Sequence, residues 1–302
     1  MHIFLEQTAS SKKIDPALMS VIECILQGVA LLSQKIYTAD VGLAGSKNIY
    51  GEEQLRLDLL AHRLYEDSFK QCDAVGIIAS EELNGEHKIG NGQYAVCMDP
   101  LDGSSLVDVN FSVGSIFAVY KTDTFLGLTG RSQLAVLFAV FGPRTTVMMS
   151  IGHGVFECTL GQDDTFIVSR ENIMVTEQTS YFAPGNLRAC LSHPGYRKLL
   201  NYWFDHKYTL RYSGGMVPDI NHILSKGQGI FTYPGYPDAP EGKLRLLFEC
   251  APMAFLMEQA GGFASDGTTP ILDKVISDIS LRTPILIGSR QDVELAEDML
   301  KG

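Results

Sequence analysis

The chain has 302 residues, enough to bury a large core, and its 45% hydrophobic and 20% charged residues are ordinary for a globular protein. Its net charge is −11 and its basic residues form no cluster longer than a pair, which argues against nucleic acid and anionic membrane surfaces as partners. No window approaches 18 apolar residues, so the sequence predicts no membrane span.

The cysteines and the N-terminal residues indicate the cellular compartment in which the protein is expected. Six cysteines are scattered along the chain without a Cys-x-x-Cys pair. This pattern favours free thiols in a reducing compartment over a zinc site or a disulfide framework. The N-terminal residues show neither the apolar core of a signal peptide nor the composition of a transit peptide. We therefore expect a cytoplasmic protein.

Two helices are predicted near the N-terminus. An Asp-Pro pair is typical of an N-cap and a first helical position, and apolar residues recur at helical spacing over residues 16–36. A loop rich in Gly and Ser is expected over residues 38–50, and a second helix over residues 52–71. Asp58 lies in a Leu-rich part of this second helix, where spacing alone indicates a solvated charge.

Acidic residues follow two predicted strands. Residues 75–79 form the first strand, and Glu81 and Glu82 come soon after it, where adjacent glutamates are usually exposed. The second strand, residues 94–98, leads into Asp-Pro-Leu-Asp at residues 99–102. Two carboxylates on a turn stiffened by proline can converge on one hard cation, which prefers oxygen ligands. Four carboxylates with no matching Lys or Arg nearby favour a site with two or more divalent ions.

The residues after this turn suit a phosphate group. Gly103, Ser104 and Ser105 offer closely spaced backbone N–H groups and hydroxyls. A metal-binding half and a phosphate-binding half thus lie within residues 99–105. The residues alone leave open the alternative of a simple Asp, Gly and Ser turn between two strands.

The rest of the chain alternates between strand and helix patterns. An apolar helix is predicted over residues 250–260, and Glu249 at its head is either a partner of the helix dipole or a metal ligand. Another helix is predicted over residues 194–206. Strands are predicted at residues 115–120, 134–141, 145–151, 155–160, 165–169 and 284–288.

The motif at residues 99–105 resembles the signature of the lithium-sensitive, metal-dependent sugar and inositol phosphatases. Continued to Phe117, it resembles the branch that contains fructose-1,6-bisphosphatase and sedoheptulose-1,7-bisphosphatase, and the likeness covers about residues 16–300. Two more segments resemble this branch, residues 208–219 and 242–249. Residues 184–188 and 210–215, taken together, look closer to sedoheptulose bisphosphatases than to fructose bisphosphatases.

The resemblance implies a mixed α/β (α+β) fold, a layered αβαβα sandwich of the sugar phosphatase type. It implies an N-terminal half, residues 1–175, with the metal and phosphate motifs, and a C-terminal α/β half, residues 176–302, with substrate-binding residues. In plastid sedoheptulose bisphosphatases two loop cysteines form a redox switch. Val41 and Ser46 stand at the matching positions here, so we expect no such switch in this loop.

The resemblance also implies roles for single residues. The roles implied for Arg and Lys fit the chemistry of these side chains, because Arg offers a planar fork of donors to a phosphate and Lys offers a point charge. The acids implied to activate the attacking water are Asp58, Glu82 and Glu52. The implied metal ligands are Glu81, Asp99, Asp102, Glu249 and the carbonyl of Leu101. The residues implied to hold the reacting phosphate are Asp102, Gly103, Ser104 and Ser105. The residues implied to hold the distal phosphate and the sugar are Asn186, Arg188, Arg211, Tyr212, Tyr233 and Lys243.

These inferences predict an enzyme that hydrolyses the 1-phosphate of sedoheptulose 1,7-bisphosphate, giving sedoheptulose 7-phosphate and phosphate. The expected cofactor is Mg²⁺, with Mn²⁺ as the alternative, at two or more ions per site. A fructose 1,6-bisphosphatase or a dual-specificity enzyme is the nearest alternative, and an inactive sugar-phosphate-binding regulator is an alternative from another class. In the family, the Arg of an Arg-Tyr pair reaches the neighbouring subunit's site, so Arg211 implies a homo-oligomer, a dimer or a tetramer.

Overall fold

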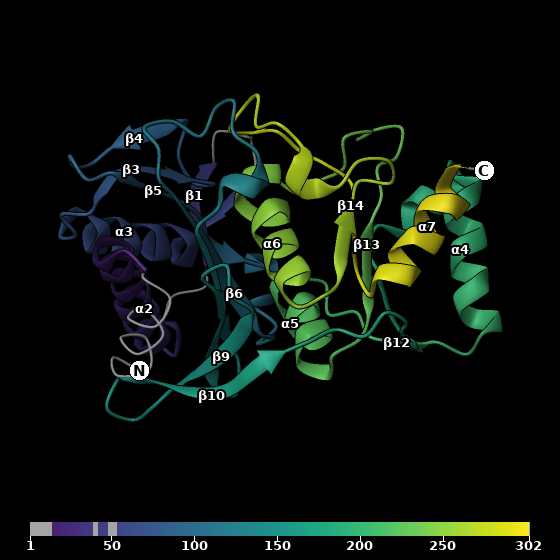
Figure 1. Cartoon of the computed structure of the whole chain (residues 1–302), viewed down its shortest axis with the longest axis horizontal. Helices are drawn as coiled ribbons and strands as arrows, with labels where there is room; N and C mark the ends of the chain where they lie inside the picture. The colour runs from purple at the N-terminus through teal and green to yellow at the C-terminus, as the bar shows by residue number, and fades with distance from the viewer. Residues whose placement is uncertain (1–13, 39–41, 48–52, 302) are drawn as a thin grey trace. The chain divides into compact units, whose positions relative to one another are not determined.

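The computed structural model describes residues 14–38, 42–47 and 53–301 (Figure 1). The chain forms two compact units. Unit 1 comprises the described residues up to 125 together with 133–151 and 156–171, and unit 2 comprises residues 126–132, 152–155 and those from 172 onward. The division into halves at residue 175, expected from the sequence, stays a prediction.

Unit 1 is built on an eight-stranded mixed sheet in the order β10-β9-β8-β7-β6-β5-β3-β4. Strands β3 and β5 are parallel, whereas β4 pairs antiparallel with β3, and the strands from β5 to β9 pair antiparallel in sequence. The strands predicted in this half are confirmed, and β4 is a further strand that was not predicted. The bounds of the strands in this sheet are β3 (Val75–Ser80), β4 (Glu86–Lys88), β5 (Tyr94–Asp102), β6 (Val113–Tyr120), β7 (Ala135–Phe141), β8 (Thr145–Ser150), β9 (Val155–Leu160) and β10 (Phe166–Ile173).

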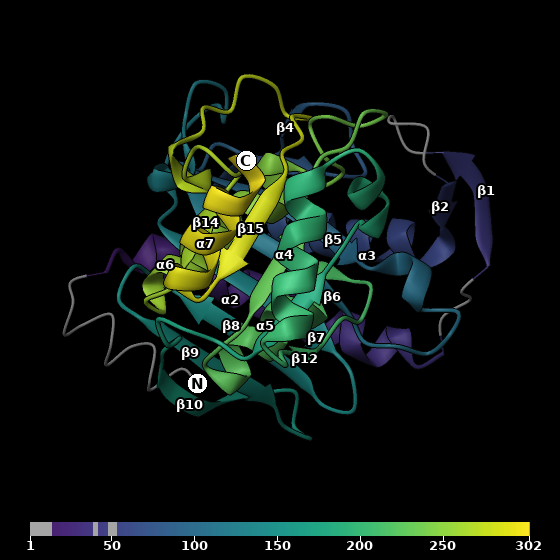
Figure 2. The same cartoon turned by 90° about the vertical axis from the view of Figure 1, so that its right-hand side faces the viewer.

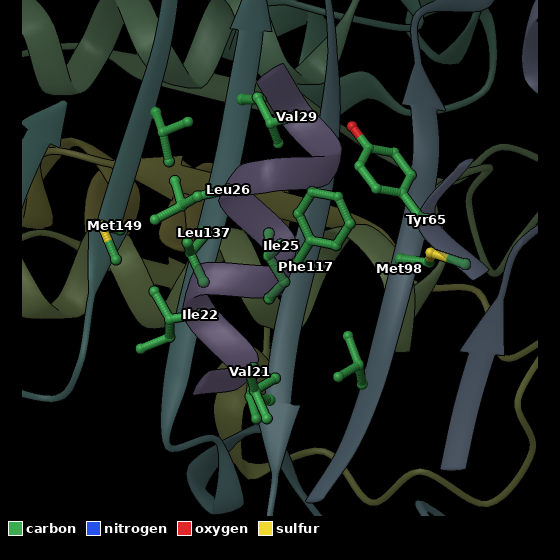
Figure 3. Close-up of a cluster of buried hydrophobic side chains, with 14 of the residues drawn as sticks. Val21, Ile22, Ile25, Leu26, Val29, Tyr65, Met98, Phe117, Leu137 and Met149 are labelled. Carbon is green, nitrogen blue, oxygen red and sulfur yellow. The ribbon is translucent and has the colours of Figure 1, made fainter. Parts of the chain in front are cut away.

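Two helices, α2 (Pro16–Ile36) and α3 (Arg56–Lys70), share one hydrophobic core with this sheet. Asp15 caps α2 by accepting a hydrogen bond from the Ala17 amide at 2.9 Å. One face of α2 carries apolar side chains at helical spacing, and Figure 3 shows several of them beside residues of the strands. These labelled side chains are Val21, Ile22, Ile25, Leu26 and Val29.

The N-terminal region also differs from its prediction in two places. Strands β1 (Leu43–Lys47) and β2 (Glu53–Leu55) pair antiparallel, so part of the expected loop is a strand and the second helix starts later than expected. By length and apolar composition α2 could cross a membrane, which the sequence did not lead us to expect. However, 56% of its apolar window is buried inside the structure, as in the core helix of a globular protein.

Unit 2 has a five-stranded mixed sheet in the order β12-β11-β13-β15-β14. Helices α4 and α7 pack together on one side of this sheet, and α5 and α6 lie on the other side (Figures 1 and 2). The predicted class, a mixed α/β protein, is confirmed. The bounds are β11 (Tyr181–Pro184), β12 (Thr209–Leu210), β13 (Ile230–Tyr233), β14 (Phe263–Ser265), β15 (Ile285–Gly288), α4 (Pro194–Asp205), α5 (Met216–Lys226), α6 (Ala251–Gln259) and α7 (Arg290–Lys301).

Candidate active site

A β-bulge in unit 1 places two aspartates on the same side of β5. In a regular strand, residues three apart point to opposite faces. Here Asp99 pairs with Ile116 and Asp102 with Gly114, so β5 advances three residues while β6 advances two. The extra residue shifts the alternation of side chains. Carboxylate oxygens of Asp99 and Asp102 therefore lie within 4.8 Å of each other.

Both of these aspartates are buried. Asp99 is 5% exposed and Asp102 is 7% exposed, and every position of β5 is buried. Two neighbouring carboxylates in a low-dielectric environment repel each other, and a cation bound between them relieves that repulsion. Because their donor atoms are hard oxygens, the pair suits Mg²⁺ or Mn²⁺ better than a thiolate-preferring metal.

Hydrogen bonds hold the bulge in shape. The Leu101 amide donates to Oδ1 of Asp99 at 3.0 Å. The Ser115 hydroxyl on β6 donates to the Pro100 carbonyl at 2.7 Å. Since that hydroxyl has one proton, the Tyr65 hydroxyl of α3 must donate to Ser115, at 2.8 Å. Burial raises the pKa of Tyr65, which keeps this donor protonated. Proline fits this position because it has no amide donor to contribute to the ladder.

Helix α3 brings further polar groups to the ends of the neighbouring strands. Asp58 lies in its first turn and is buried, and His62 follows one turn later. His62 Nδ1 is 3.1 Å from Oγ of the buried Ser80, and that oxygen also accepts the Glu82 amide proton at 3.3 Å. Burial lowers the pKa of His62. The half-buried Glu81 is held in turn by its amide, which donates to β5.

The segment expected to bind the phosphate follows β5 directly. Gly103 adopts a left-handed conformation with φ of 77°, which glycine tolerates at little cost. A short 3₁₀ turn, Ser104–Leu106, begins after it, with Ser104 half-buried and Ser105 exposed. The segment is therefore a tight turn that begins with a left-handed glycine. Glu52, like Val41, lies outside the described residues.

Glu249 in unit 2 occupies a π-helical turn, Leu246–Cys250, that leads into α6. Its carboxylate accepts the Arg245 amide proton at 2.5 Å, and the Cys250 amide donates to the Arg245 carbonyl, as a π-turn requires. Glu249 is 6% exposed. The sequence predicted an acid at a helix head, but it gave no sign of the π-turn, a feature that is frequent at functional sites.

A cavity in unit 2 of about 560 Å³ gathers most residues expected to hold the distal phosphate and the sugar. It also brings in residues that the sequence analysis missed, among them Tyr236 and Arg282. An antiparallel bridge between Arg245 and Arg282 connects the two segments that carry these arginines. The expected residues that line the cavity are Asn186, Arg188, Tyr212, Tyr233 and Lys243.

The loop after β11 is shaped to form one wall of this cavity. Asn186 has a left-handed φ of 50°, and its side-chain amide donates to the Pro234 carbonyl at 2.7 Å. The buried Tyr196 of α4 donates to the Gly185 carbonyl at 2.7 Å. A Cβ on Gly185 would lie 2.4 Å from the Tyr233 ring, so only glycine allows this close packing.

Arg211 differs from the other expected phosphate-binding residues, because it does not line this cavity of its own chain. Its amide donates to the Phe182 carbonyl, and its guanidinium donates to the Leu210 carbonyl at 2.9 Å. The guanidinium also lies 5.5 Å from the centre of the Tyr181 ring. Tyr212, the next residue, lines the cavity.

Family comparisons agree with the architecture. The N-terminal domain model of "Fructose-1-6-bisphosphatase" matches residues 1–171, and the C-terminal domain model matches residues 175–301. The chain belongs to the fructose-1,6-bisphosphatase family. Enzymes of this family are sugar bisphosphatases and are generally metal-dependent, so the predicted family and the predicted enzyme class are confirmed.

Individual relatives carry two names. The chain is 45% identical over 292 residues to "Fructose-1,6-bisphosphatase class 1" of Syntrophotalea carbinolica, covering 95% of this chain and 90% of the relative. It is 40% identical over 303 residues to "Sedoheptulose-1,7-bisphosphatase, chloroplastic" of Triticum aestivum, covering 99% and 77%. The crystal structure of Leishmania major fructose-1,6-bisphosphatase in holo form matches with a TM-score of 0.92 at 30% identity, covering 99% and 98%.

The contacts at the bulge generate a prediction for Ser115→Ala. The substitution leaves the buried Pro100 carbonyl without this donor, so we expect the unfolding free energy to fall by about 1–3 kcal/mol. It also loosens the aspartate pair, and the affinity for Mg²⁺ should fall about 10–100-fold. Denaturant unfolding and calorimetric titration with Mg²⁺ measure the two effects.

Tyr65→Phe is the matched control for this experiment. It removes the hydroxyl that donates to Ser115 but leaves the Ser115–Pro100 hydrogen bond in place. We expect a loss of stability with Mg²⁺ affinity close to wild type. Wild-type Mg²⁺ affinity in a folded Ser115→Ala protein would contradict a role for this hydroxyl in shaping the aspartate pair.

Proposed function

We propose that this protein hydrolyses the 1-phosphate of sedoheptulose 1,7-bisphosphate in a reaction that requires divalent metal ions. The observation that carries the proposal is the bulge in β5, which holds two buried carboxylates together directly before a Gly-Ser-Ser turn. In a chain of the fructose-1,6-bisphosphatase family, such a site is suited to a metal-bound phosphate.

The proposed metal ligands are all oxygen donors. Asp99 and Asp102 form the core of the set, and Glu81, Glu249 and the Leu101 carbonyl complete it. We propose Mg²⁺ as the natural ion, at two or more per site, with Mn²⁺ as a substitute. When bound, these ions supply Lewis-acid stabilisation of charge on the attacking and leaving oxygens.

Asp58 and Glu82 are proposed to accept the proton of the attacking water, with Glu52 as a third acid nearby. The buried Asp58 stands at the start of a helix whose next turn supplies His62. Through Ser80, His62 supports the backbone amide of Glu82. This connection assigns His62 a positioning role that spacing in the sequence did not suggest.

The phosphoryl oxygens of the 1-phosphate are proposed to bind Ser104, Ser105 and the backbone near Gly103, with Asp102 at their edge. Backbone N–H groups and hydroxyls held in a tight turn can stabilise negative charge without reorganising. The left-handed Gly103 is consistent with this use, because a residue without a Cβ lets a ligand approach the backbone closely.

The cavity of unit 2 is proposed to bind the distal phosphate and the sugar chain. Arg188, Lys243 and Arg282 bring three cationic side chains to its lining. Tyr212 and Tyr233 add hydroxyl groups. Cations and hydroxyls are the groups expected to bind a phosphate monoester and to orient the attached sugar.

Fructose 1,6-bisphosphate is the second candidate substrate, as the main substrate or in a dual-specificity enzyme. It is favoured by the name of the relative that is 45% identical, whereas the relative named for the sedoheptulose reaction is 40% identical. Our preference for sedoheptulose rests on residues 184–188 and 210–215, whose Asn186, Arg188 and Tyr212 line the cavity. We propose a cytoplasmic site of action, in keeping with six free cysteines.

Phosphate release from each bisphosphate, with and without Mg²⁺, tests this proposal. We expect chelation to abolish release and Mg²⁺ to restore it, with kcat/KM higher for sedoheptulose 1,7-bisphosphate. A higher value for fructose 1,6-bisphosphate would replace our substrate by the alternative. Full activity in a metal-stripped sample would refute the metal-dependent mechanism, and inactivity on both sugars with Mg²⁺ would favour a binding regulator.

Glu82→Gln tests the proposed role in water activation. The amide keeps the shape of the side chain but loses the basic oxygen, so kcat should fall about 100-fold or more with little change in KM. Glu294→Gln on α7 is the control, since Glu294 is exposed and should leave kcat unchanged. Steady-state kinetics decide, and a wild-type kcat for Glu82→Gln would remove this residue from the mechanism.

A subunit-exchange experiment tests whether Arg211 serves a neighbouring subunit's site in a homo-oligomer. Its support is that Tyr212 lines the cavity of unit 2, whereas Arg211 does not and contacts the Tyr181 ring. Losing a charge-assisted contact of about 1.5–3 kcal/mol should raise KM about tenfold or more in Arg211→Ala. Mixing Arg211→Ala with Glu82→Gln should then restore activity above the sum of the two parents.

The expected recovery arises in hybrid sites that combine an intact Glu82 with an intact Arg211 from the other chain. Samples mixed under conditions that prevent exchange serve as the control. If exchange is demonstrated and activity does not recover, Arg211 acts in its own subunit or not at all.

A further inference from the structure

Three parallel strands of unit 2 lead into the residues that line its cavity. Strand β11 pairs parallel with both β12 and β13, so the carboxyl ends of the three strands lie at the same edge of the sheet. Tyr233 ends β13, while Asn186 and Tyr212 follow closely after the ends of β11 and β12. All three residues line the cavity. The shape of the cavity therefore depends on the register of these strands.

Strand β12 is the shortest of the three and lies at an edge of the sheet. The Thr209 amide donates to the Ser180 carbonyl at 2.7 Å. The Arg211 amide donates to the Phe182 carbonyl at 2.8 Å. Backbone hydrogen bonds of this kind contribute only modestly to stability in water. The position of Tyr212, directly after this short pairing, therefore needs a further constraint.

The side chain of Asp292 links the amino ends of β11 and β12. Asp292 lies in the first turn of α7 and is only 4% exposed. Its Oδ2 accepts the amide proton of Thr179, shortly before β11, at 2.9 Å. Its Oδ1 accepts the hydroxyl proton of Tyr208, directly before β12, at 2.7 Å. One carboxylate thus holds the starting points of two neighbouring strands.

The surroundings of Asp292 suit a buried acceptor. A buried carboxylate is costly unless it is hydrogen-bonded, and each oxygen of Asp292 has a donor. The amino end of α7 also favours negative charge. Burial raises the pKa of Tyr208, and the hydrogen bond to Asp292 adds to this effect, so the hydroxyl stays protonated as a donor. Burial raises the pKa of Asp292 as well, against the effect of its two donors.

A second side chain ties the amino end of β13 to the same segment. Gln228, shortly before β13, accepts the amide proton of Ser180 through Oε1 at 3.1 Å. Ser180 in turn directly precedes β11 and accepts the Thr209 amide proton. The amino ends of all three strands are thus connected through residues 179–180, whereas the carboxyl ends lead to the cavity.

We propose that Asp292 is a positioning residue, which places Tyr212 in the wall of the cavity by holding the amino ends of β11 and β12 together. Asp292 does not itself line the cavity. The consequence for catalysis rests on the proposed function, in which this cavity binds the distal phosphate and the sugar. A misplaced Tyr212 then weakens substrate binding and leaves the chemistry at the 1-phosphate unchanged.

Three variants test the role of Asp292 in substrate binding. Tyr208→Phe removes the donor hydroxyl, and Asp292→Ala removes both acceptor oxygens. In Asp292→Asn one oxygen can still accept the Thr179 amide proton, and the side-chain amide can donate to the Tyr208 hydroxyl. We expect KM for the bisphosphate substrate to rise about tenfold in the first two variants, with kcat within about twofold of wild type. Asp292→Asn should restore KM to within about threefold of wild type.

Hydrogen exchange reports the pairing of β12 without any substrate. In Tyr208→Phe and Asp292→Ala, the amides of Thr209 and Arg211 should exchange at least about tenfold faster. The amides of β13, a strand that is paired on both sides, should keep wild-type rates.

Gln178→Ala is the matched control for both measurements. It removes another hydrogen bond between the segment before β11 and α7, from Gln178 to Gln291 at 2.8 Å. The contacts of Asp292 stay in place, so neither the exchange rates nor KM should change. Equal effects in Gln178→Ala would show a general loosening of α7 and would overturn the role assigned to Asp292.

Two further results would contradict the proposal. One is wild-type exchange at Thr209 and Arg211 in variants that lack the Asp292 contacts and keep native circular dichroism. The other is faster exchange with an unchanged KM. Failure of the proposed function gives a different result, because the wild-type protein would then release phosphate from neither bisphosphate. The exchange rates, which need no substrate, would in that case decide the positioning role alone.

Discussion

The repulsion between two buried carboxylates is the constraint on which the site of unit 1 depends. Asp99 and Asp102 stand close together in a strand that is buried at every position. An arrangement of this kind loses stability unless the backbone is held rigidly and a cation is available. The surrounding structure meets the first need, because Ser115 of the neighbouring strand β6 donates a hydrogen bond to the backbone of the bulge. The second need gives the protein its proposed dependence on metal.

Negative and positive charge are distributed unequally between the described parts of the two units. Asp99 and Asp102 of β5, and Glu81 and Glu82 after β3, belong to unit 1. The cavity lined by Arg188, Lys243 and Arg282 belongs to unit 2. A chain with a net charge of −11 can bind an anionic substrate only where cations are concentrated locally. The cavity of unit 2 provides such a place.

Local sequence patterns predicted the elements well where one rule dominated. The N-cap and spacing of residues 15–36 predicted α2, and continuous apolar runs predicted the strands from β6 to β9. The strand β1 was missed because its sequence, Leu-Ala-Gly-Ser-Lys, is rich in turn-forming residues and becomes a strand only by pairing with β2.

The geometry of the site was less accessible from the sequence. The Asp-Pro-Leu-Asp turn was recognised, but the bulge that aligns its acids is a property of the register with β6. The π-turn at Glu249 likewise depends on hydrogen bonds across five residues. The contact of His62 with Ser80 joins two different elements, and the bridge between Arg245 and Arg282 joins two segments far apart in the chain. Long-range pairing of this kind leaves no local signal.

The order of strands in unit 1 has a consequence for how the protein behaves in a crowded solution. An open sheet ends in two edge strands whose unpaired backbone groups can recruit another chain and start aggregation. At one end, β4 has only three residues, Glu-His-Lys, and every one is polar. At the other end, β10 carries Arg170, which is bound to Glu157 of β9, and the exposed Glu171 follows it. Short length and charge thus protect both edges of a sheet whose interior strands are strongly apolar.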